Sequence, residues 1–145
     1  MEASEWIRCR GHPAVTGTHR STFEVTRDAH LTAGGDCIIG VAADRGAADL
    51  SDRFRRVLCN DHAVLVTRLH VGDLVIEIHG RGSSQMTLDH PTDLVWRRSG
   101  YVCGRTVAIR ADHTARTLPR PLIAALREGD RMDVELCAVT PGRVR

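Results

Sequence analysis

The chain has 145 residues, which fits one domain, and its formal net charge of +2 lacks the large positive excess of a non-specific nucleic-acid binder. No apolar run is long enough to span a bilayer, and the N-terminus lacks a basic segment followed by an apolar one. Because the five cysteines do not resemble a secreted disulfide framework, we expect a cytoplasmic protein with no membrane partner.

Most of the chain predicts β-strands, because short runs rich in Val, Ile and Thr are separated by Gly, Asp, His and Pro. In chain order, the expected strands are 6–10, 21–26, 37–42, 63–71, 74–79, 84–88, 94–97, 106–111 and 132–139. Gly72 lies between two alternating runs and predicts a tight hairpin turn, since glycine supplies the positive φ that such turns need.

Two short segments predict helices. The first follows Ser51, a suitable N-cap, and the second has Pro119 and Pro121 near its first turn and Gly129 after its last. Each has apolar residues at helical spacing on one face. Neither is long enough to be stable alone, so each is expected to pack on a sheet.

These helices lie in two stretches of similar sequence. At one constant offset, Ala43, Asp44, Ala47, Leu50 and Leu58 match Ala111, Asp112, Ala115, Leu118 and Leu126. The match predicts an internal duplication with pseudo-twofold symmetry, with halves 7–71 and 84–139 inside a single domain 1–145. Many short strands and few helices favour a mainly β fold, either a sandwich or a barrel, with two short helices.

A fainter echo carries polar residues. His12-Pro13, followed by His19-Arg20-Ser21, resembles His90-Pro91, followed by Arg97-Arg98-Ser99. Around a twofold axis these groups would meet in one basic pocket, and the amides of the glycine-rich segment 80–84 would add anion donors. The expected ligand-binding residues are His12, His19, Arg20, Arg81, Ser83, His90, Asp93, Arg97, Arg98, Ser99 and Arg105. The plainer interpretation is that the His-Pro pairs end strands and 80–84 is only a turn.

The pattern predicts binding of a small anionic, phosphorylated ligand between the two halves. One alternative is a metal-dependent or acid–base enzyme acting on a phosphoester, with a centre built from His12, His90, Asp93 and Asp44 or Asp112. For Asp44 and Asp112 we favour a structural role, in which each accepts backbone N–H bonds or pairs with an arginine. Another alternative is an RNA-associated or scaffold protein, which the near-neutral charge does not favour.

Metal binding has little support. Cys9 and His12 are suitable ligand types, with Cys37, His90 or Cys103 to complete a set, but no Cys-x-x-Cys or His-x-x-x-His pair is present. Free thiols that pack as small apolar groups explain the cysteines more simply. We therefore assign no metal site, cofactor or catalytic residue, and leave the oligomeric state open.

Several motifs together resemble a known family. They are Arg8-Cys-Arg-Gly-His-Pro13, Gly35-Asp-Cys-Ile-Ile-Gly-Val41, Gly80-Arg-Gly-Ser83, His90-Pro-Thr-Asp93 and Cys103-Gly-Arg-Thr106. In this order they resemble an archaeal family of uncharacterised proteins, domain of unknown function 371, over nearly the whole chain. The resemblance implies an archaeal cytosolic protein with a mainly β fold, and it implies no particular activity.

Overall fold

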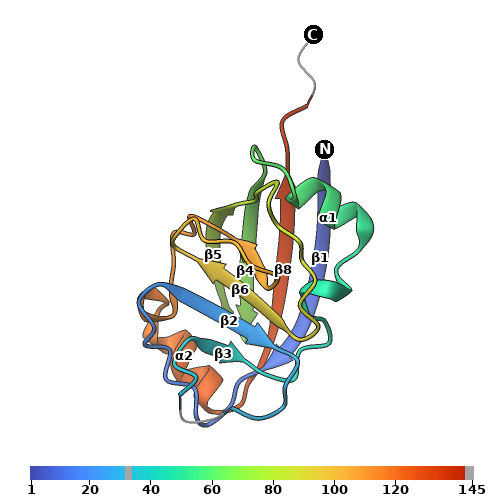
Figure 1. Ribbon diagram of the computed structural model, residues 1–145. Helices are drawn as coiled ribbons and strands as arrows, with labels where there is room; N and C mark the ends of the chain where they lie inside the picture. The colour runs from blue at the N-terminus through green and yellow to red at the C-terminus, as the bar shows by residue number, and fades with distance from the viewer. Residues whose placement is uncertain (32–33, 143–145) are drawn as a thin grey trace.

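The computed structural model describes residues 1–31 and 34–142 of the chain. They form two four-stranded β-sheets that pack against each other (Figure 1). Sheet A has the order β1 (Glu2–Arg10), β8 (Arg131–Val139), β4 (Val64–Val71) and β5 (Leu74–Arg81), and all its neighbouring strands are antiparallel. Sheet B has the order β3 (Ile38–Gly40), β2 (Thr22–Thr26), β6 (Asp93–Arg97) and β7 (Thr106–Ala108). Its central pair is antiparallel and its two outer pairs are parallel.

Alternation of side chains explains the strands of sheet A. In β1, β4 and β8 every second residue is buried, so one face meets the other sheet and the opposite face meets solvent. The predicted hairpin turn is confirmed, because Gly72 has a φ of 56° and Val71 pairs with Leu74. Sheet B differs, because all five residues of β2 are buried.

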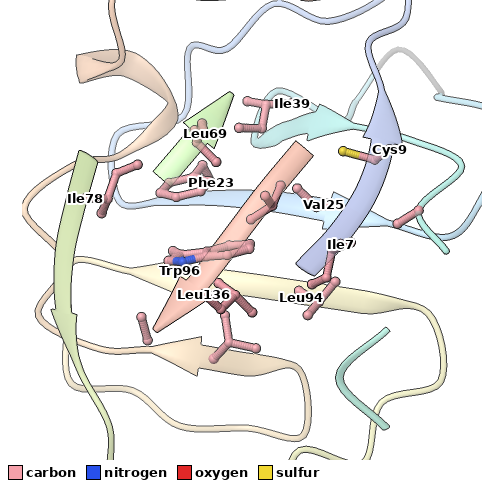
Figure 2. Close-up of a cluster of buried hydrophobic side chains, with 14 of the residues drawn as sticks. Ile7, Cys9, Phe23, Val25, Ile39, Leu69, Ile78, Leu94, Trp96 and Leu136 are labelled. Carbon is pink, nitrogen blue, oxygen red and sulfur yellow. The ribbon is translucent and has the colours of Figure 1, made fainter. Parts of the chain in front are cut away.

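The apolar core lies between the sheets (Figure 2). Phe23 and Trp96, from adjacent strands of sheet B, stack with their ring centroids 4.6 Å apart, and both are completely buried. The indole N–H of Trp96 donates a hydrogen bond of 2.9 Å to the hydroxyl of Thr67 in sheet A. This bond satisfies a polar group inside the core and joins the two sheets.

The two predicted helices are confirmed. They are α1 (Asp52–Leu58) and α2 (Arg120–Arg127), preceded by the short 3₁₀ turns η1 (Ala47–Asp49) and η2 (Ala115–Thr117). The hydroxyl of Ser51 accepts a hydrogen bond from the amide of Phe54, and Gly129 follows α2 with a φ of 85°. In Figure 1 the helices lie at opposite ends of the molecule. No helix in the described ranges is long and apolar enough to cross a membrane.

Two expectations were wrong. The barrel alternative is wrong because the strands form two separate sheets rather than one closed sheet. The strand expected at 84–88 is wrong because local hydrogen bonds turn the chain there. The amide and hydroxyl of Ser84 both donate to Asp61 Oδ1, and the amide of Met86 donates to the carbonyl of Ser83. Leu88 also has a φ of 48°, which a strand does not allow.

Candidate functional site

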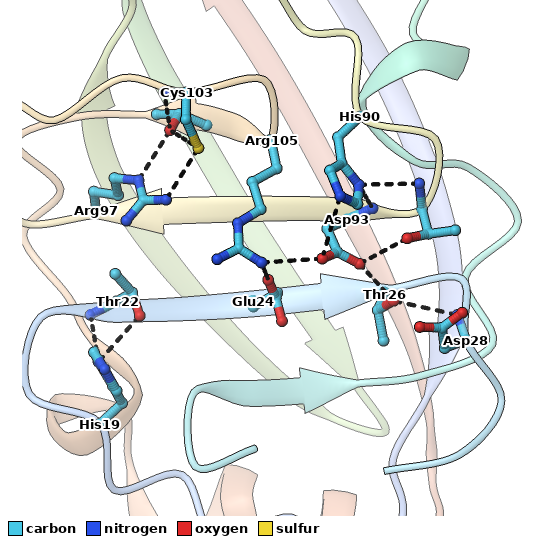
Figure 3. A network of polar contacts seen from close by, with 12 residues as sticks. His19, Thr22, Glu24, Thr26, Asp28, His90, Asp93, Arg97, Cys103 and Arg105 are labelled. Atoms are coloured by element: carbon cyan, nitrogen blue, oxygen red, sulfur yellow. Dashed lines mark hydrogen bonds and ion pairs between the residues drawn. The ribbon is translucent and has the colours of Figure 1, made fainter. Parts of the chain in front are cut away.

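The outer face of sheet B is polar, although it is largely buried. Thr22, Glu24 and Thr26 alternate with the core residues of β2 and therefore point away from the core. Glu24 is only 4% exposed, which is unusual for a carboxylate and requires a partner. We call this carboxylate and the polar groups around it, drawn in Figure 3, the sheet B network.

Arg105 supplies that partner. One of its guanidinium nitrogens, Nη1, lies 3.2 Å from Glu24 Oε1 and 3.2 Å from Asp93 Oδ2 (Figure 3). The other oxygen of Asp93 accepts hydrogen bonds from the hydroxyls of Thr26 and Thr92, at 2.8 Å and 2.9 Å. The Arg105 guanidinium thus pairs with two carboxylates, and of these the Asp93 carboxylate also accepts hydrogen bonds from two hydroxyl groups.

The two carboxyl groups therefore differ in pKa. Burial, followed by the negative charge of Asp93, raises the pKa of Glu24 to about 7, against the lowering effect of Arg105 and Arg97. Burial also acts to raise the pKa of Asp93, but hydrogen bonds from Thr26, Thr92 and Arg105 outweigh it and the pKa is lowered. Asp93 is therefore ionised at neutral pH, whereas Glu24 exchanges its proton near pH 7.

Replacing Glu24 by glutamine should remove part of the pH dependence of stability. Because the pKa of Glu24 rises from 4.5 to about 7 on folding, the folded chain binds the proton more tightly. The free energy of unfolding should therefore fall as the pH rises from about 5 to 7, by roughly 2 kcal/mol. Urea denaturation of the wild type and Glu24→Gln at several pH values measures this fall. Equal slopes in both proteins would contradict the prediction, since the two share all other titrating groups.

Cys103 and Arg97 form the second part of the network. The Arg97 guanidinium donates to the hydroxyl of Thr106 at 2.9 Å and lies 3.3 Å from Cys103 Sγ, and it stacks over the ring of Tyr101. Burial acts to raise the pKa of the Cys103 thiol, but the backbone N–H of Arg105, the hydroxyl of Thr106 and Arg97 lower it to about 7. Much of Cys103 is therefore thiolate at neutral pH.

Cys103 should be the cysteine that alkylates first. Burial raises the pKa of Cys9, Cys37, Cys59 and Cys137, so only Cys103 among the five gains thiolate character. Limited treatment with iodoacetamide at pH 7.5, read by peptide mass spectrometry, should label Cys103 first. Arg97→Gln should slow this labelling by up to about tenfold. Labelling of Cys137 at the same rate as Cys103 would sink the prediction.

The structure brings several predicted ligand residues together. His90, Asp93, Arg97 and Arg105 all belong to the sheet B network (Figure 3). His19 joins it through the amide and hydroxyl of Thr22, at 3.1 Å and 3.0 Å. Arg20 and Arg98 are exposed next to this end of β2 and β6, where the amide of Arg98 donates to the carbonyl of Ser21, and Ser99 follows in the loop.

His12, Arg81 and Ser83 lie elsewhere. His12 follows Gly11, which packs on α2, whereas His90 contacts the η1 turn through a hydrogen bond from the amide of Ala48 to its carbonyl. The structure therefore does not bring the two His-Pro pairs together. The hydrogen bonds of His19 resemble those of His90. In each ring, Nδ1 accepts hydrogen bonds from the backbone amides two and three residues later.

The glycine-rich segment 80–84 is not an open anion cradle. The amides of Arg81 and Gly82 donate to carbonyls of Ile109 and Ala63, and the amide of Ser84 donates to the carboxylate of Asp61. The hydroxyl of Ser83 accepts from the amide of Gln85. These donors hold the chain in its turn and are not directed at a ligand.

Asp44 and Asp112 have the structural role favoured above. Asp44 Oδ1 accepts the amide of Arg8, and Asp112 Oδ1 accepts the amide of His79, both at 2.9 Å. These donors belong to β1 and β5, so each aspartate fixes the segment after β3 or β7 to an edge of sheet A. In residues 1–31 and 34–142 no three His, Cys, Asp or Glu side chains lie close enough to hold a metal ion.

Sequence reasoning missed Glu24 as a member of the site. A glutamate within an alternating run is typical of a solvent-facing position, and nothing local predicts that a distant arginine covers it. The available signal was the sequence Thr22-Phe23-Glu24-Val25-Thr26, which places only polar residues on the outer face of a central strand.

These observations define a small, mainly β protein of two sheets, with a partly buried ionic network on the outer face of one of them. The chain belongs to the family described as Domain of unknown function (DUF371), whose model matches residues 7–139, and the family resemblance is thereby confirmed. An uncharacterized protein of the archaeon Methanocaldococcus jannaschii is 37% identical over 126 residues, which cover 87% of this chain and 93% of that protein.

Proposed function

We propose that the sheet B network binds a small anionic ligand, most simply a phosphate monoester, between Arg97 and Arg105. Both guanidinium groups lie over the same face of the sheet (Figure 3). In the described part of the chain Arg97 pairs with no carboxylate, since its contacts are a hydroxyl, a thiol and an aromatic ring. A guanidinium that pairs with no carboxylate on a polar face is the observation that carries the proposal.

Glu24 would adjust the charge of this site. With Glu24 and the Cys103 thiol ionised, three negative groups face the two guanidinium groups, whereas protonation of both leaves one positive charge in excess. An anion therefore binds better when Glu24 is neutral, and binding should tighten as the pH falls through about 7. Glu24→Gln combined with Cys103→Ser should bind equally well at pH 6 and pH 8, whereas Glu24→Gln alone should keep the part of the pH dependence that Cys103 contributes.

The test is calorimetry with sulfate, inorganic phosphate and a panel of phosphate monoesters. Sulfate keeps its charge across this pH range, so it isolates the titration of the protein. Arg97→Gln should abolish sulfate binding, Arg98→Ala and Arg20→Ala should weaken it less, and Arg56→Gln on α1 is the matched exposed control. Absence of binding by every anion in the panel, or full binding by Arg97→Gln, would refute the proposal.

A second candidate is acid–base catalysis on a phosphoester at the same site. It is favoured by one observation, the buried Glu24 carboxyl with a pKa of about 7, which suits a group that accepts and returns a proton at neutral pH. Hydrolysis of p-nitrophenyl phosphate that Glu24→Gln removes would support this candidate. No turnover over pH 5–9, with or without added divalent metal, would exclude it for that substrate.

We also propose that the chain is an internal duplication whose pseudo-twofold axis passes between the paired residues Glu24 and Val95. After β1 the chain forms two strands, a 3₁₀ turn, a helix and another strand, and the same order of elements follows β5. Asp44 and Asp112 make equivalent contacts with the two edge strands of sheet A. Two residues before them, Ala42 has a φ of 53° and Arg110 a φ of 52°. The second half would then start at β5 rather than at residue 84, and the ligand site would lie between the halves.

We also propose that the protein is cytoplasmic. All five cysteines, which lie in the described part of the chain, are free thiols. This supports a reducing compartment.

A further inference from the structure

A cleft lies along the edge strand β1, on the other sheet and away from the sheet B network. It has a volume of about 340 Å³ where Arg8, Arg10, Ala42 and Arg131 line it. It continues into an adjoining space of about 300 Å³ next to Trp6, with Arg8, Asp44 and Arg131 shared by both parts. We call this space the β1 cleft. It is large enough for a ligand of nucleotide size.

Trp6, Arg8 and Arg10 alternate along β1 and therefore point to the same side of the strand. Residues two apart in a strand are separated by roughly 7 Å. Trp6 is 51% exposed, and the centroid of its indole ring lies 5.4 Å from the centroid of the imidazole ring of His70 on β4. The cleft thus offers an aromatic surface at one end and guanidinium groups at the other.

The charges of the β1 cleft favour an anion. Asp133 accepts two bonds of 3.0 Å from Arg131, and its Oδ1 lies 3.7 Å from Arg8. Arg10 forms no ion pair in the described part of the chain. The cleft therefore holds three guanidinium groups and two carboxylates, which leaves one positive charge in excess.

The wall of the cleft is held in an uncommon conformation. Ala42 has a φ of 53°, a value that residues with a side chain rarely adopt. Backbone bonds between Arg10 and Val41 and between Arg8 and Asp44 fix it on both sides. Arg110 lines the cleft at the opposite edge of sheet A and has a φ of 52°, so this conformation shapes both clefts and does not by itself mark a ligand site.

From this geometry we infer that the β1 cleft binds a nucleoside monophosphate, with the base on Trp6 and the phosphate on Arg8 and Arg10. An aromatic ring beside guanidinium groups suits a ligand that has both a flat base and a phosphate. The cleft at the opposite edge of sheet A, lined by His79, Arg81 and Asp112, provides the comparison. In the β1 cleft, Trp6 stands two residues before Arg8. In the opposite cleft, the residue two before His79 is Glu77, so the opposite cleft lacks the indole surface.

The test uses AMP, ribose 5-phosphate and adenosine, with calorimetry and tryptophan fluorescence excited at 295 nm. AMP should quench the emission of Trp6 and bind at least about tenfold more tightly than ribose 5-phosphate. Trp6→Leu should remove this preference, and Arg10→Gln should weaken AMP binding by about tenfold. Arg81→Gln is the matched control in the opposite cleft, and Arg97→Gln separates this site from the sheet B network. Both should keep the AMP-dependent quenching of Trp6, which reports the β1 cleft, whereas calorimetry of Arg97→Gln should lose only the binding that the sheet B network contributes.

Three results would overturn the inference. One is equal affinity for AMP and ribose 5-phosphate, which would mean that no base is recognised. Another is loss of AMP binding in Arg97→Gln together with full binding in Arg10→Gln. The third is binding of single-stranded RNA oligomers with no binding of AMP, which would assign the surface to RNA.

Discussion

Gly11→Ala is expected to lower the free energy of unfolding by more than about 3 kcal/mol and Tm by about 10 °C. A Cβ atom at residue 11 would stand 1.8 Å from the carbonyl oxygen of Leu126, in the last turn of α2. The clash is with backbone, so no side chain can rotate to relieve it. The amide of Gly11 also donates to the carbonyl of Asp130, which fixes the chain against the end of the helix.

Gly82 provides a matched case at the other helix. Its added Cβ would lie 2.0 Å from the carbonyl oxygen of Leu58 at the end of α1, so Gly82→Ala should cost a similar amount. Gly34, where an added Cβ meets nothing within 4 Å, is the control and should change stability by less than about 0.5 kcal/mol. Urea and thermal denaturation of the three variants measure these costs. A Gly11→Ala protein as stable as Gly34→Ala would mean that the contact between strand and helix end relaxes easily.

Arg105→Met should cost about 3 kcal/mol at pH 8 and less at pH 5.5. Removal of the guanidinium leaves Glu24 and Asp93 close together without their shared cation. At pH 8 the charge of Glu24 is then unpaired in a buried position or must be neutralised by a proton. At pH 5.5 Glu24 is already protonated, because its pKa is about 7 even beside Arg105.

Arg68 is the matched control, because it also contacts two carboxylates, Glu77 and Glu135. These three side chains are between 27% and 46% exposed on the open face of sheet A, so Arg68→Met should cost less than about 1 kcal/mol. Glu24→Gln combined with Arg105→Met should recover most of the loss at pH 8. If Arg105→Met costs the same at both pH values, or if Glu24→Gln gives no recovery, the shared-cation interpretation fails.

Much of the fold could be predicted because local patterns decide it. Alternation defined β1, β4 and β8, and the caps at Ser51 and Gly129 defined the helix ends. The segment 84–88 was mispredicted because its turn depends on Asp61, a carboxylate more than twenty residues away. The parallel pairing of β2 with β3 and of β6 with β7 was also beyond reach, since each depends on a return of the chain that no local signal encodes.

The candidate site was predicted in part for a similar reason. His90, Asp93, Arg97 and Arg105 were selected as polar residues near a repeated motif, and they lie close in sequence around one strand and one loop. Glu24 lies about seventy residues before Asp93 and meets it only through the antiparallel pairing of β2 with β6. Trp6, Arg8 and Arg10 were passed over because an alternating strand edge looks the same whether or not a cleft borders it.

The position of β8 has a consequence for how the chain folds as it is made. β8 lies between β1 and β4, so residues 131–139 supply the bonds that join the start of the chain to its middle. Until the ribosome has released this segment, β1 has no antiparallel neighbour and only the β4–β5 hairpin of sheet A can form. Assembly of this sheet therefore waits for the synthesis of residues 131–139, and the slow closure of such long-range pairs should limit its rate.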